Sequence, residues 1–416
     1  MHWGCLVDQG ERLQRYAELA VRLGANVAEG QDVVVLCHPE HRELARAVGE
    51  EAYRAGARYV DVSYNDPHLK LHRLRLAAKE SLPFIPPWWD SRNETMVRDK
   101  GCLIQIAGDP EPHLLEGIDS ERMRLAIMPS TPSLLNAVVS QEVNWTIIAG
   151  PLEGWAETIF GEPDIARLWE LVAAATRLDD ADPVASWEGH IRRLAARADA
   201  LNAASFDGLR FLGPGTDLFI GLMPQSLWRS ASATTSWGRR YVANMPTEEV
   251  FTTPDRRRTE GVVRSTRPLD LGGVTVEGLE LTFEKGRIVD VRAERNPDAV
   301  TAQLDRDEGA RMLGEVALVD QTSAVGATGV VFHNTLFDEN ATCHIAYGRG
   351  LDFATKDLPE SEEARGEVGF NTSMVHTDAM IGGPKVDVFG VNEAGVDAPL
   401  IEDNEWVHEP LGAQTT

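Results

Sequence analysis

The stretch Asp32-Val33-Val34-Val35-Leu36-Cys37 decides the fold of the first half of the chain. It is a short, continuous apolar run, which is typical of a β-strand buried on both faces. Apolar residues at helical spacing precede it over residues 11–24 and follow it over residues 40–55, and residues 58–62 form the next apolar run. Strands that alternate with helices predict a mostly parallel α/β sheet.

The same pattern continues outward from this stretch and then changes. Further apolar runs of strand length lie at residues 102–106, 125–128 and 145–148. Residues 164–204 have helical spacing, and Asp182-Pro183 is typical of a helix start. Beyond them, short apolar runs flank Gly213-Pro214-Gly215, as in a hairpin.

The change in pattern predicts two domains in an α/β protein. We expect a mostly parallel α/β N-terminal domain of residues 1–190 and a more strand-rich, α+β C-terminal catalytic domain of residues 191–416. A length of 416 residues fits two domains better than one.

Composition restricts the partners and the compartment. The net charge of −25 repels phosphate backbones, so we expect no nucleic-acid partner. No apolar stretch approaches the roughly 18 residues of a membrane span, so we expect no membrane partner either. The N-terminus lacks the pattern of an export signal, and the four cysteines are scattered without a C-x-x-C pair. These features predict a cytoplasmic protein.

Residue types that bind metals gather in four motifs of the second half. In the first motif, residues 244–254, Glu248 and Glu249 lie side by side in an apolar, β-branched segment. On a strand one of them would point into a pocket and the other away, although a plain surface pair is also common. In the second motif, Glu315 opens the apolar run 315–319, where it is either a buried ligand or a residue at the solvent edge.

The third and fourth motifs supply histidines. If a helix begins near Asp338, then Asp338 and Glu339 complement its dipole, and His344 is a core residue or a ligand inside it. His376 and Asp378 are two residues apart, so on a strand they share one face, before Gly382-Gly383-Pro384 ends the element. They would form half of a metal site or a simple hydrogen-bonded pair. Two glutamates, two histidines and an aspartate would suit a dinuclear site of divalent metal ions.

The four motifs together resemble a known family. N-x-P-T-E-E-V-F-T-x-P, L-G-E-V-A-L-V, N-T-L-F-D-E-N-A-x-x-H-I-A and H-x-D-x-M-I-G, in this order, are similar to the metallo-aminopeptidases of the aminopeptidase T, aminopeptidase S and PepS family. The similarity extends over nearly the whole chain. The resemblance implies that the metal ligands are Glu249, Glu315, His344, His376 and Asp378.

The resemblance also implies what the protein does. Two divalent metal ions (Zn, Co, Mn or Mg) and a metal-bound hydroxide would hydrolyse the N-terminal peptide bond of peptide substrates with a free α-amine. It further implies a homodimer whose N-terminal domain helps to cover the active site. Glu248 or a ligand carboxylate would accept the proton.

One position departs from the family. Leu351 stands where the family usually has a catalytic tyrosine, seven residues after the histidine of the third motif. In a continuous helix His344, Tyr347 and Leu351 would share one face. We therefore expect Tyr347, a water or the metals themselves to replace the missing hydroxyl.

Two other functions remain open at this stage. A mononuclear iron, ring-cleaving dioxygenase could use His344, His376 and Asp378 as a facial triad. It would have no use for both Glu249 and Glu315, which favours the aminopeptidase. The other alternative is a non-catalytic metal- or peptide-binding homologue, for which Leu351 is the only support.

Overall fold

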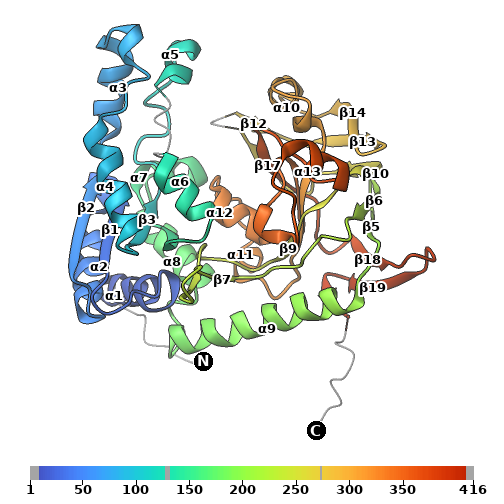
Figure 1. Cartoon of the computed structure of the whole chain (residues 1–416), viewed down its shortest axis with the longest axis horizontal. Coiled ribbons are helices and arrows are strands. Elements are labelled where there is room, and N and C mark those ends of the chain that lie inside the picture. The colour runs from blue at the N-terminus through green and yellow to red at the C-terminus, as the bar shows by residue number, and fades with distance from the viewer. Residues whose placement is uncertain (1–8, 127–131, 272–273, 409–416) are drawn as a thin grey trace. The chain divides into compact units, whose positions relative to one another are not determined.

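A computed structural model of the chain describes residues 9–126, 132–271 and 274–408 (Figure 1). The chain separates into two compact units. The first comprises Met1–Trp187 and Ser232–Met245, and the second comprises Glu188–Ala231 and Pro246–Thr416. No sequence pattern indicates that residues 232–245 return to the first unit. Among the described residues, no helix has both the length and the apolar character that crossing a bilayer requires.

The first unit contains a four-stranded, all-parallel sheet in the order β2-β1-β3-β4. The strands are β1 Asp32–Cys37, β2 Tyr59–Tyr64, β3 Cys102–Ala107 and β4 Asn144–Ala149. The helices around it are α1 Gln9–Glu18 with the π-helical η1 Leu19–Gly24, α2 Arg42–Arg54, α3 Pro67–Leu76, α4 Pro87–Arg98, α5 Ser120–Leu125, α6 Pro132–Val139, α7 Glu153–Phe160 and α8 Ile165–Ala175. The parallel α/β sheet expected from the sequence is confirmed.

Helices cover both faces of this sheet, as continuous apolar strands require. Val34 and Leu103 pack against Met96 of α4 and Ala137 of α6. Helix α2 and η1 contact the sheet through other residues, since successive side chains of a strand alternate between faces. One expected strand does not form as predicted: Leu125 ends helix α5, while residues 127–128 lie outside the described part.

The second unit contains two antiparallel sheets. Its large sheet has the order β14-β13-β10-β6-β5-β18-β19-β20, and its small sheet has the order β17-β16-β15-β9. The large sheet consists of β5 Gly208–Gly213, β6 Thr216–Leu222, β10 Pro254–Arg264, β13 Glu280–Glu284, β14 Arg287–Arg292, β18 Asp387–Val391, β19 Asp397–Glu402 and β20 Glu405–Trp406. The small sheet consists of β9 Val250–Thr252, β15 Leu313–Leu318, β16 His344–Gly348 and β17 His376–Met380. The strand-rich character of the second half is therefore confirmed.

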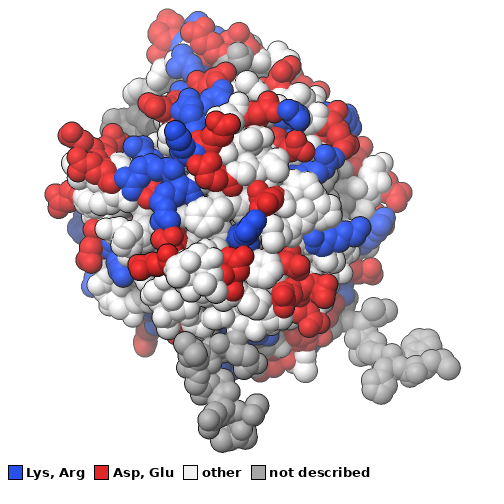
Figure 2. Space-filling model, turned by 90° about the vertical axis from the view of Figure 1, so that its right-hand side faces the viewer, with Lys and Arg blue, Asp and Glu red and all other residues white. Residues whose placement is uncertain are grey.

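Shorter elements complete the two units. Helix α9, Pro183–Ala204, leads from the first unit into the second. The others are α10 Pro297–Leu304, α11 Ala324–Ala327, α12 Thr335–Asp338 and α13 Glu362–Val368, the two-stranded pairs β7 Ser232–Thr234 with β8 Arg240–Val242 and β11 Leu269–Asp270 with β12 Thr275–Val276, and the 3₁₀ turns η2 Pro39–His41, η3 Lys79–Ser81, η4 Gly309–Arg311, η5 Glu339–Ala341 and η6 Asp352–Ala354. Figure 2 shows acidic and basic side chains interspersed over one face of the molecule, so the excess negative charge is not gathered there into a single patch.

An ion pair fixes helix α9 to the end of β15, a strand of the small sheet that is buried along its whole length. The Arg197 guanidinium donates to both oxygens of Asp320, at 3.1 and 2.5 Å. The Asp320 side chain is 3% exposed and that of Arg197 is 11% exposed. Burial opposes ionisation of Asp320, but hydrogen bonds from Arg197 and Thr322 and the Arg197 charge outweigh it and hold the pKa of this carboxyl below its usual value.

We expect Asp320→Asn to destabilise the second unit by about 3 kcal/mol at neutral pH, because a buried guanidinium loses its counter-charge. A pKa lowered by folding stabilises the protein above the unfolded carboxyl pKa, and this contribution disappears as the pH falls through the folded pKa. The difference in Tm between variant and wild type should therefore shrink in acid. Thermal melts at several pH values measure it.

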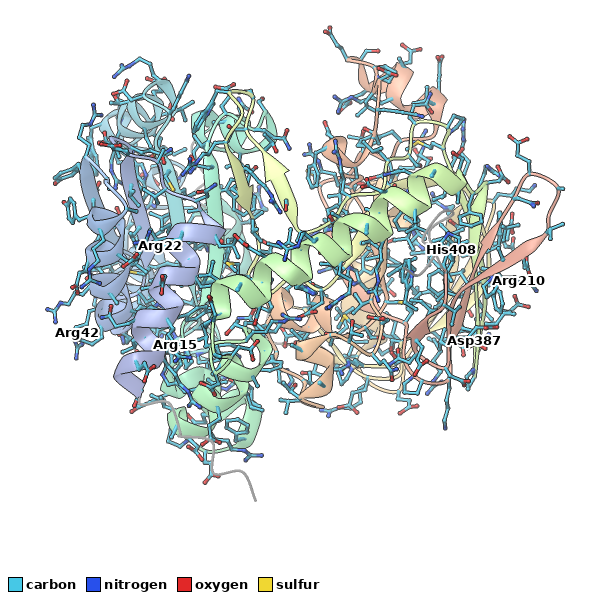
Figure 3. All side chains as sticks on the ribbon, turned by 90° about the horizontal axis from the view of Figure 1, so that it is seen from below. Arg15, Arg22, Arg42, Arg210, Asp387 and His408 are labelled. Carbon is cyan, nitrogen blue, oxygen red and sulfur yellow. The ribbon has the colours of Figure 1, made fainter. Side chains whose placement is uncertain are left out.

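The matched control is Asp217→Asn, which removes an exposed carboxylate that Arg210 approaches at 3.2 Å. Arg210 is labelled in Figure 3. A surface ion pair contributes at most about 1 kcal/mol, so this variant should melt within a few degrees of the wild type. Equal effects of the two substitutions would contradict a structural role for the buried pair.

Candidate metal site

Strand pairing gathers the site on one face of the small sheet. Across β16 and β17, His344 pairs with Met380, Ala346 with Asp378 and Gly348 with His376. Directly paired residues lie on the same face of a sheet, and so do residues two apart on one strand. His344, His376 and Asp378 therefore project from a single face. The strand predicted for His376 and Asp378 is confirmed, as is their common side.

The two glutamates arrive on the same face from the other strands. Glu315 pairs with Ala346 across β15 and β16. Glu249 immediately precedes β9, and its carboxylate lies 3.2 Å from Nε2 of His344. Glu249, Glu315 and His344 are all buried, whereas the His376 side chain is 32% exposed. The cluster thus has a closed end at His344 and an open end at His376.

The side chains form two groups that share one carboxylate. One ligand atom each of Glu249, Glu315 and His344 lie within 4.8 Å of one another, and so do those of Glu315, His376 and Asp378. Oε1 of Glu315 lies 3.9 Å from Nε2 of His344, and its Oε2 lies 3.1 Å from Nε2 of His376. Each oxygen of Glu315 therefore faces a different histidine.

A backbone contact orients His376. Its Nδ1 lies 2.8 Å from the carbonyl oxygen of Arg349, which can only accept a hydrogen bond, so Nδ1 carries the proton. Nε2 is then directed toward Glu315 and toward Asp378, whose Oδ1 is 3.6 Å away. A histidine that binds a metal commonly donates its second ring N–H to a carbonyl in this way.

The electrostatics of the cluster fit bound cations. Burial raises the pKa of Glu249 and of Asp378, and the nearby charge of Glu315 adds to both shifts. For the two histidines burial opposes protonation, but the surrounding carboxylates outweigh it and raise the pKa of His344 and of His376 to about 10. Carboxylates buried together repel one another, and positive charge beside them or the uptake of protons relieves this repulsion. An N/O donor set without thiolates accepts divalent metal ions, so the residues fit that group.

Glu339 is a member of this neighbourhood that the sequence reasoning missed. Helix α12 ends at Asp338, and the 3₁₀ turn η5 begins at Glu339 with Asp338 as its N-cap residue, so both carboxylates do lie at the start of a helical turn, but that turn ends at Ala341 and does not carry His344. Asp338 also accepts hydrogen bonds from the backbone of Phe332 and Asn334, at 2.7 and 3.0 Å. Burial and the charges of Asp378, Glu249 and Glu315 raise the pKa of Glu339 well above its usual value. The only indication of this in the sequence is that Glu339 lies inside the third motif, five residues before His344.

Glu248 lies elsewhere. Its carboxylate is 3.3 Å from Nε2 of His190, and both side chains are almost fully buried. Its backbone N–H donates to Oδ1 of Asn340. Adjacent residues of an extended segment point to opposite sides, which accounts for the separate surroundings of Glu248 and Glu249. The structure brings the five expected ligands together, and Glu248 is outside both of the groups described above.

The prediction of a helix that carries His344, Tyr347 and Leu351 on one face is wrong. Residues 344–348 form strand β16, in which positions 344 and 347 face opposite sides. The Tyr347 hydroxyl donates to Oε1 of Gln303 at 2.8 Å, and Thr377 donates to the same oxygen. Leu351 lies beyond the strand, where its N–H donates to Oγ1 of Thr253. The catalytic role of Tyr347 stays a prediction, and this geometry favours a packing role.

We expect Tyr347→Phe to retain the wild-type kcat within about twofold and to cost about 1 kcal/mol of stability, the usual loss for one buried hydrogen bond. The phenol points to Gln303 rather than to the cluster. Steady-state kinetics and a thermal melt measure the two effects. A fall in kcat of tenfold or more at unchanged KM would instead assign the hydroxyl to the reaction.

Comparison with known proteins agrees with this arrangement. The sequence model of the family described as thermophilic metalloprotease (M29) matches residues 9–406. Aminopeptidase T of Thermus thermophilus is 42% identical over 402 residues, covering 95% of this chain and 98% of that protein. Aminopeptidase AmpS of Bacillus subtilis is 36% identical, with the same coverage.

The fold comparison leads to the same family. The solved structure of wild-type AmpT from Thermus thermophilus superposes with a TM-score of 0.89 at 40% identity. The match covers 95% of this chain and 99% of the solved one. This chain is therefore a member of the thermophilic metalloprotease (M29) family.

Proposed function

We propose that the chain is a metal-dependent aminopeptidase that removes residues one at a time from peptides with a free α-amine. The observation that carries the proposal is the sharing of Glu315 between two groups of ligands, each completed by one histidine and one further carboxylate. The aminopeptidases among its relatives, which match nearly the whole chain, support it.

We infer two divalent ions per chain from this arrangement. Glu249, Glu315 and His344 would hold one ion, and Glu315, His376 and Asp378 the other, so Glu315 belongs to both groups. The donor set suits Zn, Co, Mn or Mg. When bound, such ions supply Lewis-acid activation of the peptide carbonyl and of the attacking water.

The protein's own residues would place the substrate and move its protons. Glu339 and Asp378 line the same small cavity, so a Glu339 carboxylate can reach a substrate there. We assign proton acceptance to Glu339 rather than to Glu248, because Glu248 lies against His190. Buried carboxylates around this space also suit a cationic α-amine, so we expect the enzyme to require a free N-terminus.

The dioxygenase alternative is not favoured. It needs His344, His376 and Asp378 around one iron, whereas His344 groups with Glu249 and Glu315, and His376 with Asp378. A facial triad also has no place for the two additional carboxylates. The aminopeptidases among the relatives argue equally against a non-catalytic homologue.

Two further features belong to the proposal on the strength of the family resemblance. We infer a homodimer and a cytoplasmic location. Size-exclusion chromatography with light scattering tests the first of these directly.

We expect metal analysis to find two divalent ions per wild-type chain and chelation to abolish peptidase activity. Glu315→Ala should lose both ions and at least about a hundredfold in activity, since even outer-shell changes cost up to that much. The exposed Glu308 serves as the control, and Glu308→Ala should keep both ions and full activity. One iron per chain together with ring-cleaving oxygenase activity would overturn the proposal.

A separate test uses blocked substrates. We expect Leu-Gly-Gly to be cleaved at least about a hundredfold faster than its N-acetylated form, because acetylation removes the charge that the buried carboxylates would bind. Release of free leucine is the measurement for the first peptide, and release of acetyl-leucine for the second. Similar rates for the two peptides would contradict an exopeptidase.

A further inference from the structure

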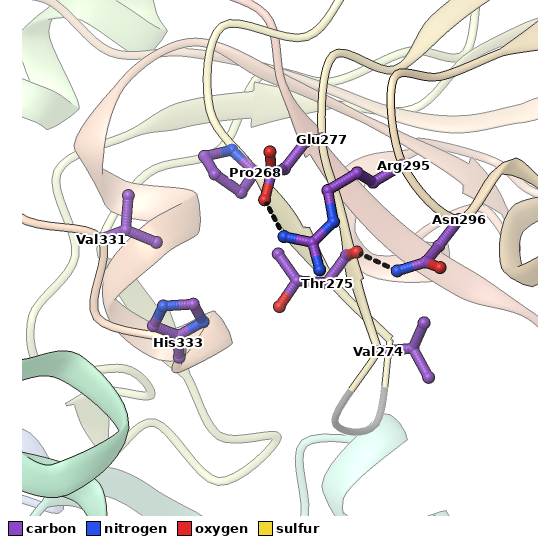
Figure 4. Close-up of a pocket in the computed structure, with 8 residues that line it drawn as sticks. All are labelled: Pro268, Val274, Thr275, Glu277, Arg295, Asn296, Val331 and His333. Atoms are coloured by element: carbon purple, nitrogen blue, oxygen red, sulfur yellow. Dashed lines mark hydrogen bonds and ion pairs between the residues drawn. The ribbon is translucent and has the colours of Figure 1, made fainter. Parts of the chain in front are cut away.

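A broad cavity lies in the second unit, near the metal site. It has a volume of about 610 Å³ and opens to solvent. Figure 4 shows Thr275, Glu277, Arg295 and Asn296 on one side of it, with Val331 and His333 facing them from another segment. None of these residues belongs to the proposed metal ligands.

A smaller cavity lies between this space and the metal site. Its volume is about 60 Å³, and its lining includes Glu339, Asp378 and Met380. It shares Pro268, Val331 and His333 with the broad cavity. Because three residues line both spaces, the narrow cavity adjoins the broad one on one side and the carboxylates of the cluster on the other.

Size and openness indicate what the broad cavity would hold. An aminopeptidase needs a closed end for the first residue and an open path for the rest of the peptide. A volume of about 610 Å³ lies in the range that encloses ligands much larger than one side chain. The narrow cavity beside Asp378 is far smaller, at about 60 Å³.

The chemistry of the lining suits a peptide backbone. Arg295 donates to Glu277 at 2.8 Å, and the Asn296 amide donates to the carbonyl of Thr275 at 2.7 Å. These two hydrogen bonds hold hydrogen-bond donors (Arg295 and Asn296) and acceptors (Glu277 and the Thr275 carbonyl) side by side along one wall of the cavity. The side chains of Arg295 and Glu277 are 65% and 40% exposed, so both can still reach a ligand.

We propose that this cavity binds the part of the substrate that follows the scissile bond, with Arg295 and Glu277 as contacts for its polar groups. The inference rests on the proposed aminopeptidase activity. It makes peptide length, rather than the first residue, the property that this surface recognises.

The test compares a substrate that extends into the cavity with one that does not. Leu-Gly-Gly-Gly and leucine p-nitroanilide share the first residue and differ beyond it. We expect Arg295→Ala to lower kcat/KM for the tetrapeptide about tenfold more than for the anilide, mainly through KM, as loss of a charge-assisted hydrogen bond would. Thr275→Trp, which would fill the cavity, should likewise lower kcat/KM more for the tetrapeptide than for the anilide.

Arg292→Ala is the matched control. Arg292 is also an exposed arginine paired with a carboxylate, Asp290, but it lines neither cavity. This variant should keep the wild-type ratio of the two kcat/KM values. Calorimetry gives a second readout, in which Arg295→Ala should weaken binding of a tetrapeptide analogue with a reduced first amide bond about tenfold.

The outcomes separate this inference from the proposed function. A wild-type enzyme that is loaded with metal and inactive on both substrates would refute the aminopeptidase activity. Equal losses on both substrates would overturn the cavity assignment alone. A changed ranking among leucine, arginine and glutamate anilides at an unchanged length dependence would also overturn it, and would assign the cavity to the first residue.

Discussion

Mutual repulsion among buried carboxylates is the constraint on which the second unit depends. Glu249, Glu315 and Asp378 approach one another on one sheet face. Glu339 is close enough that the charges of all three raise its pKa. Such a group is tolerable away from water only if nearby positive charge offsets it or if some carboxylates take up protons, which their raised pKa values favour. Protonated His344 and His376 can supply part of the positive charge, because the pKa of each is raised. The two groups that share Glu315 could each hold a cation.

The small sheet holds these groups in position because its register is fixed. A shift of one residue between β16 and β17 would turn His376 and Asp378 to the opposite face, where Thr377 and Ala379 now lie. The end of β16 also requires glycine. Gly348 has a φ of 104°, and a Cβ there would meet the carbonyl oxygen of Val375 at 2.1 Å. The close approach of the Gly348 backbone to Val375, next to His376, is therefore possible only because residue 348 has no side chain.

Much of the fold could be predicted from the sequence, because the deciding patterns are local. The apolar run at residues 32–37 and the spacing of His376 and Asp378 each specify a strand by themselves. The segment His344–Gly348 was wrongly predicted to be helical because it is short and because acidic residues precede it, as they commonly do at the start of a helix. Its partners β15 and β17 are distant in sequence, and their pairing decides its conformation. Glu339 was missed for the same reason, since only tertiary folding brings it to the cluster.

The division of the chain has a consequence for its synthesis. The first unit includes residues 232–245, and Asn244 in that segment bridges to Ile147 of β4, the last strand of the parallel sheet. Residues 188–231 of the second unit intervene. Domains commonly fold as they leave the ribosome, N-terminal first. Here the segment 232–245, which pairs with β4, is not available until translation has passed Met245. Until then the edge of β4 has no partner and is open to wrong pairing with another strand.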